Sequence, residues 1–177
     1  MRRSRRRRLA LAGIFTTMVA AASLTGTAGP AQAYNNSNIT IKYARVDTDN
    51  CARLSGTLPV VAYSDGCRLN DSWDGTFFRK DPNGVAVKIE VYNKGVLVGK
   101  AEFHPYDEKL WVYDTRDDSD TLYAILHVTW GPSYGPYRGP VNGYTVKDLD
   151  IADNLQVVLV VNDDQDGDEL ARVTGIA

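Results

Sequence analysis

Two kinds of side chain that could act in catalysis or metal binding stand out in the sequence: a pair of histidines and a large excess of aspartates. His104 and His127 are the only histidines, so histidine alone cannot supply a three-ligand catalytic zinc site. The chain has no zinc-protease helix motif, phosphate-binding loop or dinucleotide fingerprint. We therefore assign no catalytic residue, and a small hydrolase that pairs one histidine with a carboxylate is the alternative function rather than the leading one.

The aspartates gather in segments that are typical of turns, where a short carboxylate bonds to nearby backbone. In the most suggestive segment, Asn162, Asp164 and Asp166 alternate and Gly167 follows, as in the first half of a calcium-binding loop. The twelfth position of such a loop would be Val173 instead of a bidentate glutamate. The sequence therefore favours a solvated hairpin tip without a cofactor. The alternative is a Ca²⁺ site whose ligands are Asn162, Asp164, Asp166 and Asp168.

An aromatic segment, residues 130–144 (WGPSYGPYRGPVNGY), is the second candidate surface. Tyrosine and tryptophan present a flat apolar face together with a polar group, which suits recognition of sugars and of proteins. We expect a proline-stiffened loop here, although its tyrosines would alternatively pack back onto a sheet edge. The candidate ligand-binding residues are Trp130, Tyr134, Tyr137, Arg138 and Tyr144. Four other aromatic residues are expected in the core: Trp73, Phe77, Phe78 and Trp111.

The first 33 residues have the three parts of a secretory signal. Six arginines lie within the first eight positions, an apolar stretch follows from Leu9, and Ala31-Gln32-Ala33 fits a cleavage site. Five serine and threonine residues dilute the apolar stretch, which argues against a membrane anchor. We expect residues 1–33 to be removed, leaving residues 34–177 as a single secreted domain with no membrane span. The arginine-rich start looks bacterial and leaves the general and twin-arginine export routes open.

The charge of the expected secreted part narrows its partners. Residues 34–177 carry 14 basic and 22 acidic side chains, so their net charge is −8. Nucleic-acid binding normally needs a concentrated basic face, and we expect no nucleic-acid partner.

The two cysteines agree with an oxidising compartment. Cys51 and Cys67 are the only pair, and neither belongs to a C-x-x-C motif. We predict that they form a disulfide, which would stabilise the fold by about 3 kcal/mol for a loop of this size.

The rest of the sequence reads as short strands. Val85, Val87, Ile89 and Val91 alternate with Lys88 and other residues, as in a strand with one buried face. Asn93-Lys94-Gly95 then predicts a three-residue hairpin connection to 96–103. The other predicted strands are 39–43, 110–113, 122–130, 144–151, 156–161 and 170–176. We place the strand 156–161 centrally because both of its faces are apolar.

Seven to nine such strands, with turns every ten residues or so and no helical periodicity, indicate an all-β fold. We predict a single antiparallel β-sandwich, with a closed β-barrel as the alternative. The expected function is that of a secreted noncatalytic binding module that recognises a polysaccharide or a protein through the aromatic segment. A secreted enzyme inhibitor is a variant of this hypothesis, because a stiff loop loses little entropy on binding.

Overall fold

The computed structural model describes residues 36–165 and 167–177. The predicted signal, residues 1–33, and one predicted calcium ligand, Asp166, lie outside the described residues. Apart from a single 3-10 turn, η1 (Asn36–Asn38), every described element is a strand, which confirms the all-β prediction. The strands are β1 (Ile39–Asp47), β2 (Arg53–Gly56), β3 (Val61–Ala62), β4 (Gly66–Leu69), β5 (Thr76–Arg79), β6 (Val85–Asn93), β7 (Val96–His104), β8 (Lys109–Asp114), β9 (Tyr123–Val128), β10 (Ser133–Arg138), β11 (Gly143–Asp148), β12 (Gln156–Asn162) and β13 (Glu169–Ile176).

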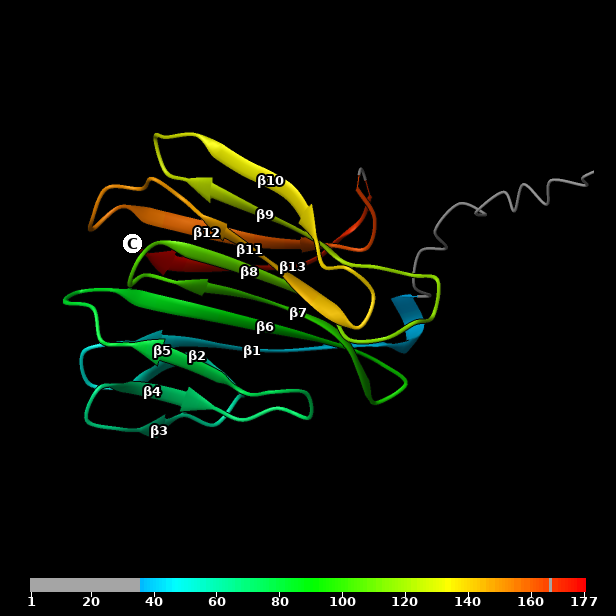
Figure 1. Cartoon of the computed structure of the whole chain (residues 1–177), viewed down its shortest axis with the longest axis horizontal. Helices are drawn as coiled ribbons and strands as arrows, with labels where there is room; N and C mark the ends of the chain where they lie inside the picture. Colours follow the sequence, from blue (N-terminus) through cyan, green and yellow to red (C-terminus); the bar gives the residue numbers. More distant parts are fainter. Residues whose placement is uncertain (1–35, 166) are drawn as a thin grey trace, which may run out of the picture.

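The main sheet is antiparallel and bends into two facing layers (Figure 1). One layer runs β11-β8-β7-β6-β1-β2, and the other runs β10-β9-β12-β13. A single backbone pairing, Ile176 with Val85, joins the layers between β13 and β6. The arrangement is the predicted antiparallel sandwich, and it is nearly closed into a barrel. No helix in the described part of the chain is long and apolar enough to cross a membrane.

The core lies between the two layers and follows the period-two alternation of the strands. In β9 and the residue before it, every second side chain is buried: Leu122, Ala124, Leu126 and Val128. The predicted continuation to Trp130 is wrong, because Trp130 adopts a positive φ of 62° in the following turn and is fully exposed. β12 pairs with both β9 and β13, which confirms its predicted central position.

The barrel comes closest to closing at the end of β10. Gly139 lies so near the backbone of β8 that a Cβ atom there would be 2.5 Å from the backbone nitrogen of Asp114. Only glycine allows this approach without displacing a strand. The segments that follow β8 and β10 are thereby held next to each other.

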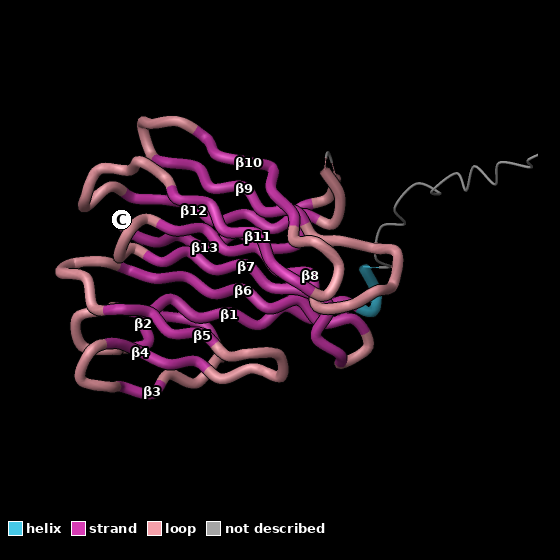
Figure 2. The backbone as a smooth tube through the Cα atoms, in the orientation of Figure 1, coloured by secondary structure: helices cyan, strands magenta, loops and turns pink. Residues whose placement is uncertain are grey.

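A small second sheet, β3-β4-β5, packs on the outside of the main sheet next to β1 and β6 (Figure 2). Its core is a separate apolar cluster in which Phe78 and Leu69 contact Ala86 and Val46. The predicted disulfide Cys51–Cys67 is confirmed, with a Cα–Cα distance of 5.3 Å, and it ties the segment after β1 to β4. The sequence pattern does not predict the strands of this small sheet, which are only two to four residues long.

Two local predictions need correction. The β6–β7 connection is a two-residue turn, because Asn93 pairs with Val96 and both Lys94 and Gly95 have positive φ. Residues 130–144 are not one loop, since β10 and the start of β11 lie within them. β10 tolerates its Gly135-Pro136 step because β10 is an edge strand and its pairing with β9 shifts register there.

The expectation that four aromatic residues lie in the core is right only for Phe78, which is fully buried. Trp73 and Phe77 are 41% and 38% exposed, and Trp111 is half-buried. The side chains of Phe77 and Trp111 lie on strand faces opposite to those of the buried Phe78 and Val112, as strand alternation requires.

Candidate functional site

The outer face of β8 and β11 carries a row of aromatic rings. The ring centroids of Trp111 and Tyr144 are 5.1 Å apart, and those of Tyr113 and Tyr144 are 5.4 Å apart. His104, on neighbouring β7, extends the row, with its ring 5.7 Å from that of Trp111. Tyr144 is 52% exposed, whereas Tyr113 is buried beneath it. The face therefore presents a partly exposed aromatic surface on rigid strands.

A hollow of about 290 Å³ opens beside this row. We call it, together with Tyr144, the aromatic groove; its lining residues are Phe77, Arg79, His104, Tyr106, Asp107, Lys109 and Trp111. Its rim is charged: the Arg79 guanidinium lies 4.2 Å from the centre of the Tyr106 ring, and Lys109 pairs with Asp107 at 3.0 Å. On the other side of Phe77 a second hollow of about 350 Å³ is lined by Arg68, Asp74, Gly75, Thr76 and Phe77. Phe77 thus stands as a ridge between two polar-rimmed hollows.

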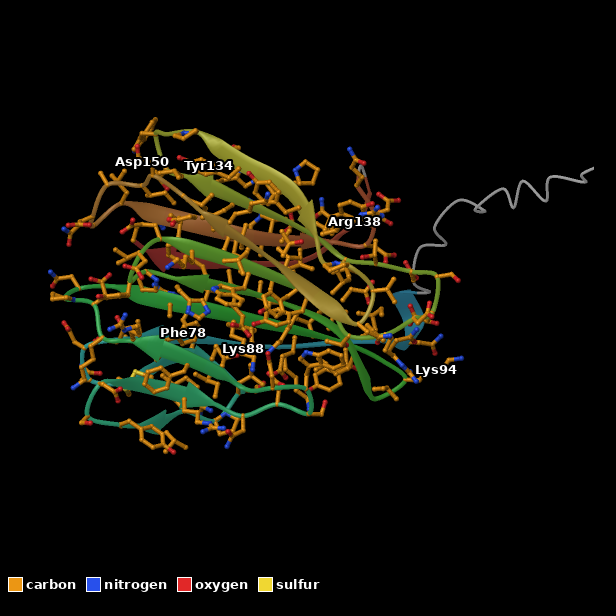
Figure 3. The ribbon with its side chains drawn as sticks, in the orientation of Figure 1. Phe78, Lys88, Lys94, Tyr134, Arg138 and Asp150 are labelled. Atoms are coloured by element: carbon orange, nitrogen blue, oxygen red, sulfur yellow. A yellow bond between two sulfur atoms is a disulfide. The ribbon has the colours of Figure 1, made fainter. Side chains whose placement is uncertain are left out.

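Beneath the groove, the outer face of β6 and β7 holds four buried charged side chains. Lys88 lies opposite Glu102, and Glu90 lies opposite Lys100, in the antiparallel register. All four are at most 1% exposed. We call these residues and Asp71 the buried charge network (Figure 3 labels Lys88). The prediction that β6 has only one buried face is wrong, because the turn between β4 and β5 covers its second face.

Asp71 fastens that covering turn to the sheet. Its Oδ2 accepts hydrogen bonds from Lys88 Nζ at 2.6 Å and Lys100 Nζ at 2.8 Å. Its Oδ1 accepts from three successive backbone N–H groups, those of residues 73, 74 and 75, at 2.7–3.1 Å. One carboxylate therefore both shapes the turn and forms ion pairs with two lysines.

The pKa values in the network move in the direction that ion pairing dictates. Burial alone would raise the pKa of Asp71, but hydrogen bonds from Lys100 and Lys88 and their positive charges hold it well below its usual range. The pKa of Glu102 is lowered despite complete burial, because His104 and Lys100 bond to it. Burial would lower the pKa of Lys100, but Glu102 and Asp71 raise it. Asp71, Glu102 and Lys100 are therefore charged at neutral pH.

The network also supports the aromatic row directly. Glu102 contacts His104, with 3.0 Å between Oε2 and Nε2, and accepts a 2.5 Å hydrogen bond from the Thr76 hydroxyl. Lys100 Nζ lies 4.2 Å from the centre of the Tyr113 ring. These contacts hold the His104 ring, which lines the groove, and the Tyr113 ring, which lies beneath Tyr144.

Neither histidine is arranged as in a known hydrolytic triad. His104 is paired with Glu102 through Nε2, but among the described residues no serine, threonine or cysteine side chain forms a hydrogen bond with its other ring nitrogen. His127 Nδ1 lies 2.7 Å from Ser133 Oγ on the exposed face of β9 and β10. Among the described residues, no carboxylate forms a hydrogen bond with His127. A serine–histidine contact of this kind lacks the group that orients the base.

The structure separates the residues predicted to bind a ligand. Trp130 lies in the turn before β10. Arg138 is the last residue of that strand (Figure 3). Tyr134 and Tyr137 pack against the main core, and the Tyr134 hydroxyl donates to the backbone oxygen of Asp150 at 2.9 Å. Only Tyr144 belongs to the aromatic groove.

The acidic turn between β12 and β13 shows no metal cluster in its described part. Asn162 ends β12, and Asp163 N donates to the Asp168 backbone oxygen at 3.1 Å, which closes the turn. Residues 36–165 and 167–177 contain no group of three or more His, Cys, Asp or Glu side chains that could hold a metal ion. The turn therefore has the geometry of a hairpin connection, and Asp164 lies within it.

Sequence reasoning missed Phe77 and Trp111 as members of the groove. The available signal was period-two alternation: Trp111 lies between Leu110 and Val112, which are both buried, so its side chain must lie on the other face.

Comparisons of the chain with protein-family models, with curated proteins and with solved structures find no match.

Proposed function

We propose that the protein is a secreted, noncatalytic binding module that recognises a polysaccharide through the aromatic groove. The observation that carries this proposal is the row formed by Trp111 and Tyr144, partly exposed on one rigid sheet face and continued by Phe77. The residues for recognition are therefore Phe77, Trp111 and Tyr144, and only the last belongs to the aromatic segment expected from the sequence.

The chemistry of the groove suits a sugar chain. Aromatic faces contact the apolar C–H surface of a sugar ring, and nearby polar groups bond to its hydroxyls. Arg79, Asp107 and Lys109 supply donors and acceptors at the rim. The buried charge network holds His104 and Tyr113, against which Trp111 and Tyr144 pack, so little conformational entropy is lost when a ligand arrives.

Secretion is part of the same proposal. The disulfide Cys51–Cys67 is typical of oxidising compartments, and residues 1–33 have the pattern of a cleaved signal. Expression of the full chain in an exporting bacterial host tests this step. We expect protein that starts at Tyr34 and lacks free thiols in the medium or periplasm; uncleaved cytoplasmic protein would refute it.

A binding assay on a panel of insoluble and soluble polysaccharides tests the ligand. We expect at least one polysaccharide to retain the protein, and Trp111→Ala and Tyr144→Ala each to weaken retention at least tenfold. Trp130→Ala is the matched control, because Trp130 is the most exposed tryptophan but lies outside the groove. Equal losses in Trp130→Ala and Trp111→Ala, with unchanged thermal melts, would disprove the groove assignment.

Inhibition and turnover assays, run beside the same panel, separate the alternative functions. Retention by no polysaccharide, together with inhibition of an enzyme, would replace the polysaccharide by a protein partner. Turnover of a polysaccharide or ester that His104→Ala abolishes would instead make the protein a hydrolase. The His104–Glu102 contact at the groove is the one observation that favours this second candidate.

A further inference from the structure

A separate cavity of about 490 Å³ opens where the barrel nearly closes. It lies between the segment that follows β8 and the segment that connects β10 to β11. Its lining residues are Asp114, Ser119, Asp120, Thr121, Arg138, Gly139, Pro140, Val141 and Thr145. The volume falls in the range of small-molecule sites, about 300–1,000 Å³.

This cavity lies on the opposite side of β11 from the aromatic groove. Thr145 pairs with Val112, whose side chain points into the core, whereas Tyr144 pairs with Tyr113 on the outer face. Because successive side chains alternate along a strand, the two sites cannot share a ligand residue on β11.

Two polar side chains in the cavity wall are buried and incompletely bonded. Asp114 is 1% exposed; its Oδ1 accepts a hydrogen bond from Arg116 N, and the Thr121 side chain lies near its carboxyl group. Thr121 is 7% exposed, and neither its Oγ1 nor Asp114 Oδ2 makes a hydrogen bond of normal geometry in the described structure. A buried carboxylate oxygen without a good donor costs free energy unless a ligand supplies that donor.

The charge around the cavity is negative. Among the described residues, no salt bridge reaches Asp114 or Asp120. The pKa of Asp120 is raised to about 7 by burial and by the negative charges of Asp163, Asp118 and Asp114, although its hydrogen bond from Thr121 N lowers it. Burial likewise raises the pKa of Asp114. Arg138 also lines the cavity, and in the described structure it forms no salt bridge with either carboxyl group.

We propose that this cavity binds the primary ammonium group of an amino sugar. An ammonium group has three donors, and Asp114, Asp120 and Thr121, which carry oxygen acceptors, all line this one cavity. Ser119, Thr145 and Arg138 line the same wall and bond to ring hydroxyls. Pro140 and Val141 contact the apolar face of the ring. A metal ion is not the occupant, since the described residues hold no cluster of metal-ligating side chains.

Calorimetric titration of the purified full-length protein at pH 7 tests the proposal. The probes are glucosamine, N-acetylglucosamine and glucose, which share a ring but differ in the charge at one position. We expect glucosamine to bind at least tenfold more tightly than the other two. Equal affinities, or no binding of glucosamine at tens of millimolar, would overturn the proposal. Binding of the aliphatic diamine cadaverine as tightly as glucosamine would overturn the assignment to a sugar.

Two variants locate the site. Asp114→Asn and Asp120→Asn keep the shape of the side chain and remove its charge, and we expect each to weaken glucosamine binding at least tenfold. Asp120 is the safer variant for folding, because it is only partly buried. Asp65→Asn, in the exposed turn before β4 and outside both sites, is the matched control and should leave binding unchanged. A loss in Asp65→Asn equal to that in Asp120→Asn would place the amine elsewhere and refute this site.

Discussion

The buried charge network and the cavity beside β8 both hold buried carboxyl groups, but they treat those groups in opposite ways. In the network, Asp71 and Glu102 contact lysines on adjacent strands, and their pKa values fall. In the cavity, Asp114 and Asp120 face other carboxylates, and their pKa values rise. A carboxyl group is therefore favoured in its ionised form in one region and disfavoured in that form in the other.

The difference separates a structural role from a binding role. A buried carboxylate that is fully paired holds elements together, and removing it leaves uncompensated partners. A buried carboxylate without a cation lowers stability at neutral pH and leaves room for a ligand that brings the charge. The network positions the aromatic groove, whereas the cavity is itself the candidate site.

The largest effect should come from Asp71→Asn. The substitution leaves Lys88 and Lys100 without their shared carboxylate, so we expect a loss of about 3–5 kcal/mol in the free energy of unfolding. Urea unfolding of the variant measures it. Asp74→Asn is the matched control, because Asp74 also pairs with Lys100 but is 43% exposed; its cost should stay below about 1 kcal/mol. Equal costs would mean that the network is not the clamp described above.

The next largest effect concerns stability in acid. The folded pKa of Asp71 lies below its unfolded value of 3.8, so its contribution is complete above pH 4 and is lost as the pH falls further. We expect the wild-type protein to lose about 2–3 kcal/mol between pH 4 and pH 2 through this group. Denaturant melts over that interval measure the loss, and Asp71→Asn should show a flatter dependence. An equally steep dependence in the variant would assign the acid sensitivity to other carboxylates.

The cavity should respond in the opposite direction and by less. The folded pKa of Asp120 is raised to about 7, so the folded state holds this proton more tightly than the unfolded state. Stability from this group is therefore present below pH 4 and declines as the pH rises through 7. We expect Asp120→Asn to be more stable than wild type at pH 8 by roughly 1–2 kcal/mol, after allowance for solvent screening. The two proteins should unfold alike at pH 4; a variant that is less stable at pH 8 would contradict the assignment.

The smallest effect on stability should come from Tyr144→Ala. Tyr144 is 52% exposed on an edge strand, and the charge network beneath it remains intact. We expect a change of about 0.5 kcal/mol or less in the free energy of unfolding. Thermal melts check it. A larger loss would show that the aromatic row holds the fold together and is not a free binding surface.

Much of the fold could be predicted from local patterns. The alternation in 85–91 predicts β6, the apolar run 156–161 predicts a central strand, and two cysteines permit one intramolecular disulfide. Strand β10 was harder, because prolines usually exclude pairing and only the edge position with its register shift makes pairing possible. The short strands of the small sheet lack enough residues to show a period.

The candidate site was much less predictable. The aromatic segment 130–144 predicts Tyr144 as a binding residue. The same sequence predicts Trp111 and Phe77 in the core, because aromatic residues in strands usually lie there. Lys88 and Glu90 gave the alternation that indicates a solvent-facing side. Nothing local shows that Asp71, 17 residues away from Lys88 along the chain, folds over that side.

The sequence by itself determined the all-β class, the antiparallel pairing of β6 with β7 and the disulfide, because these depend on side-chain period, turn residues and cysteine number. Only the tertiary structure decided which carboxylates have cations beside them and which aromatic rings share a face. Those properties arise when distant segments meet, as when the turn after β4 covers β6 and β7 or when Gly139 approaches β8. Local alternation reports which face of a strand a residue occupies, but what covers that face depends on the rest of the chain.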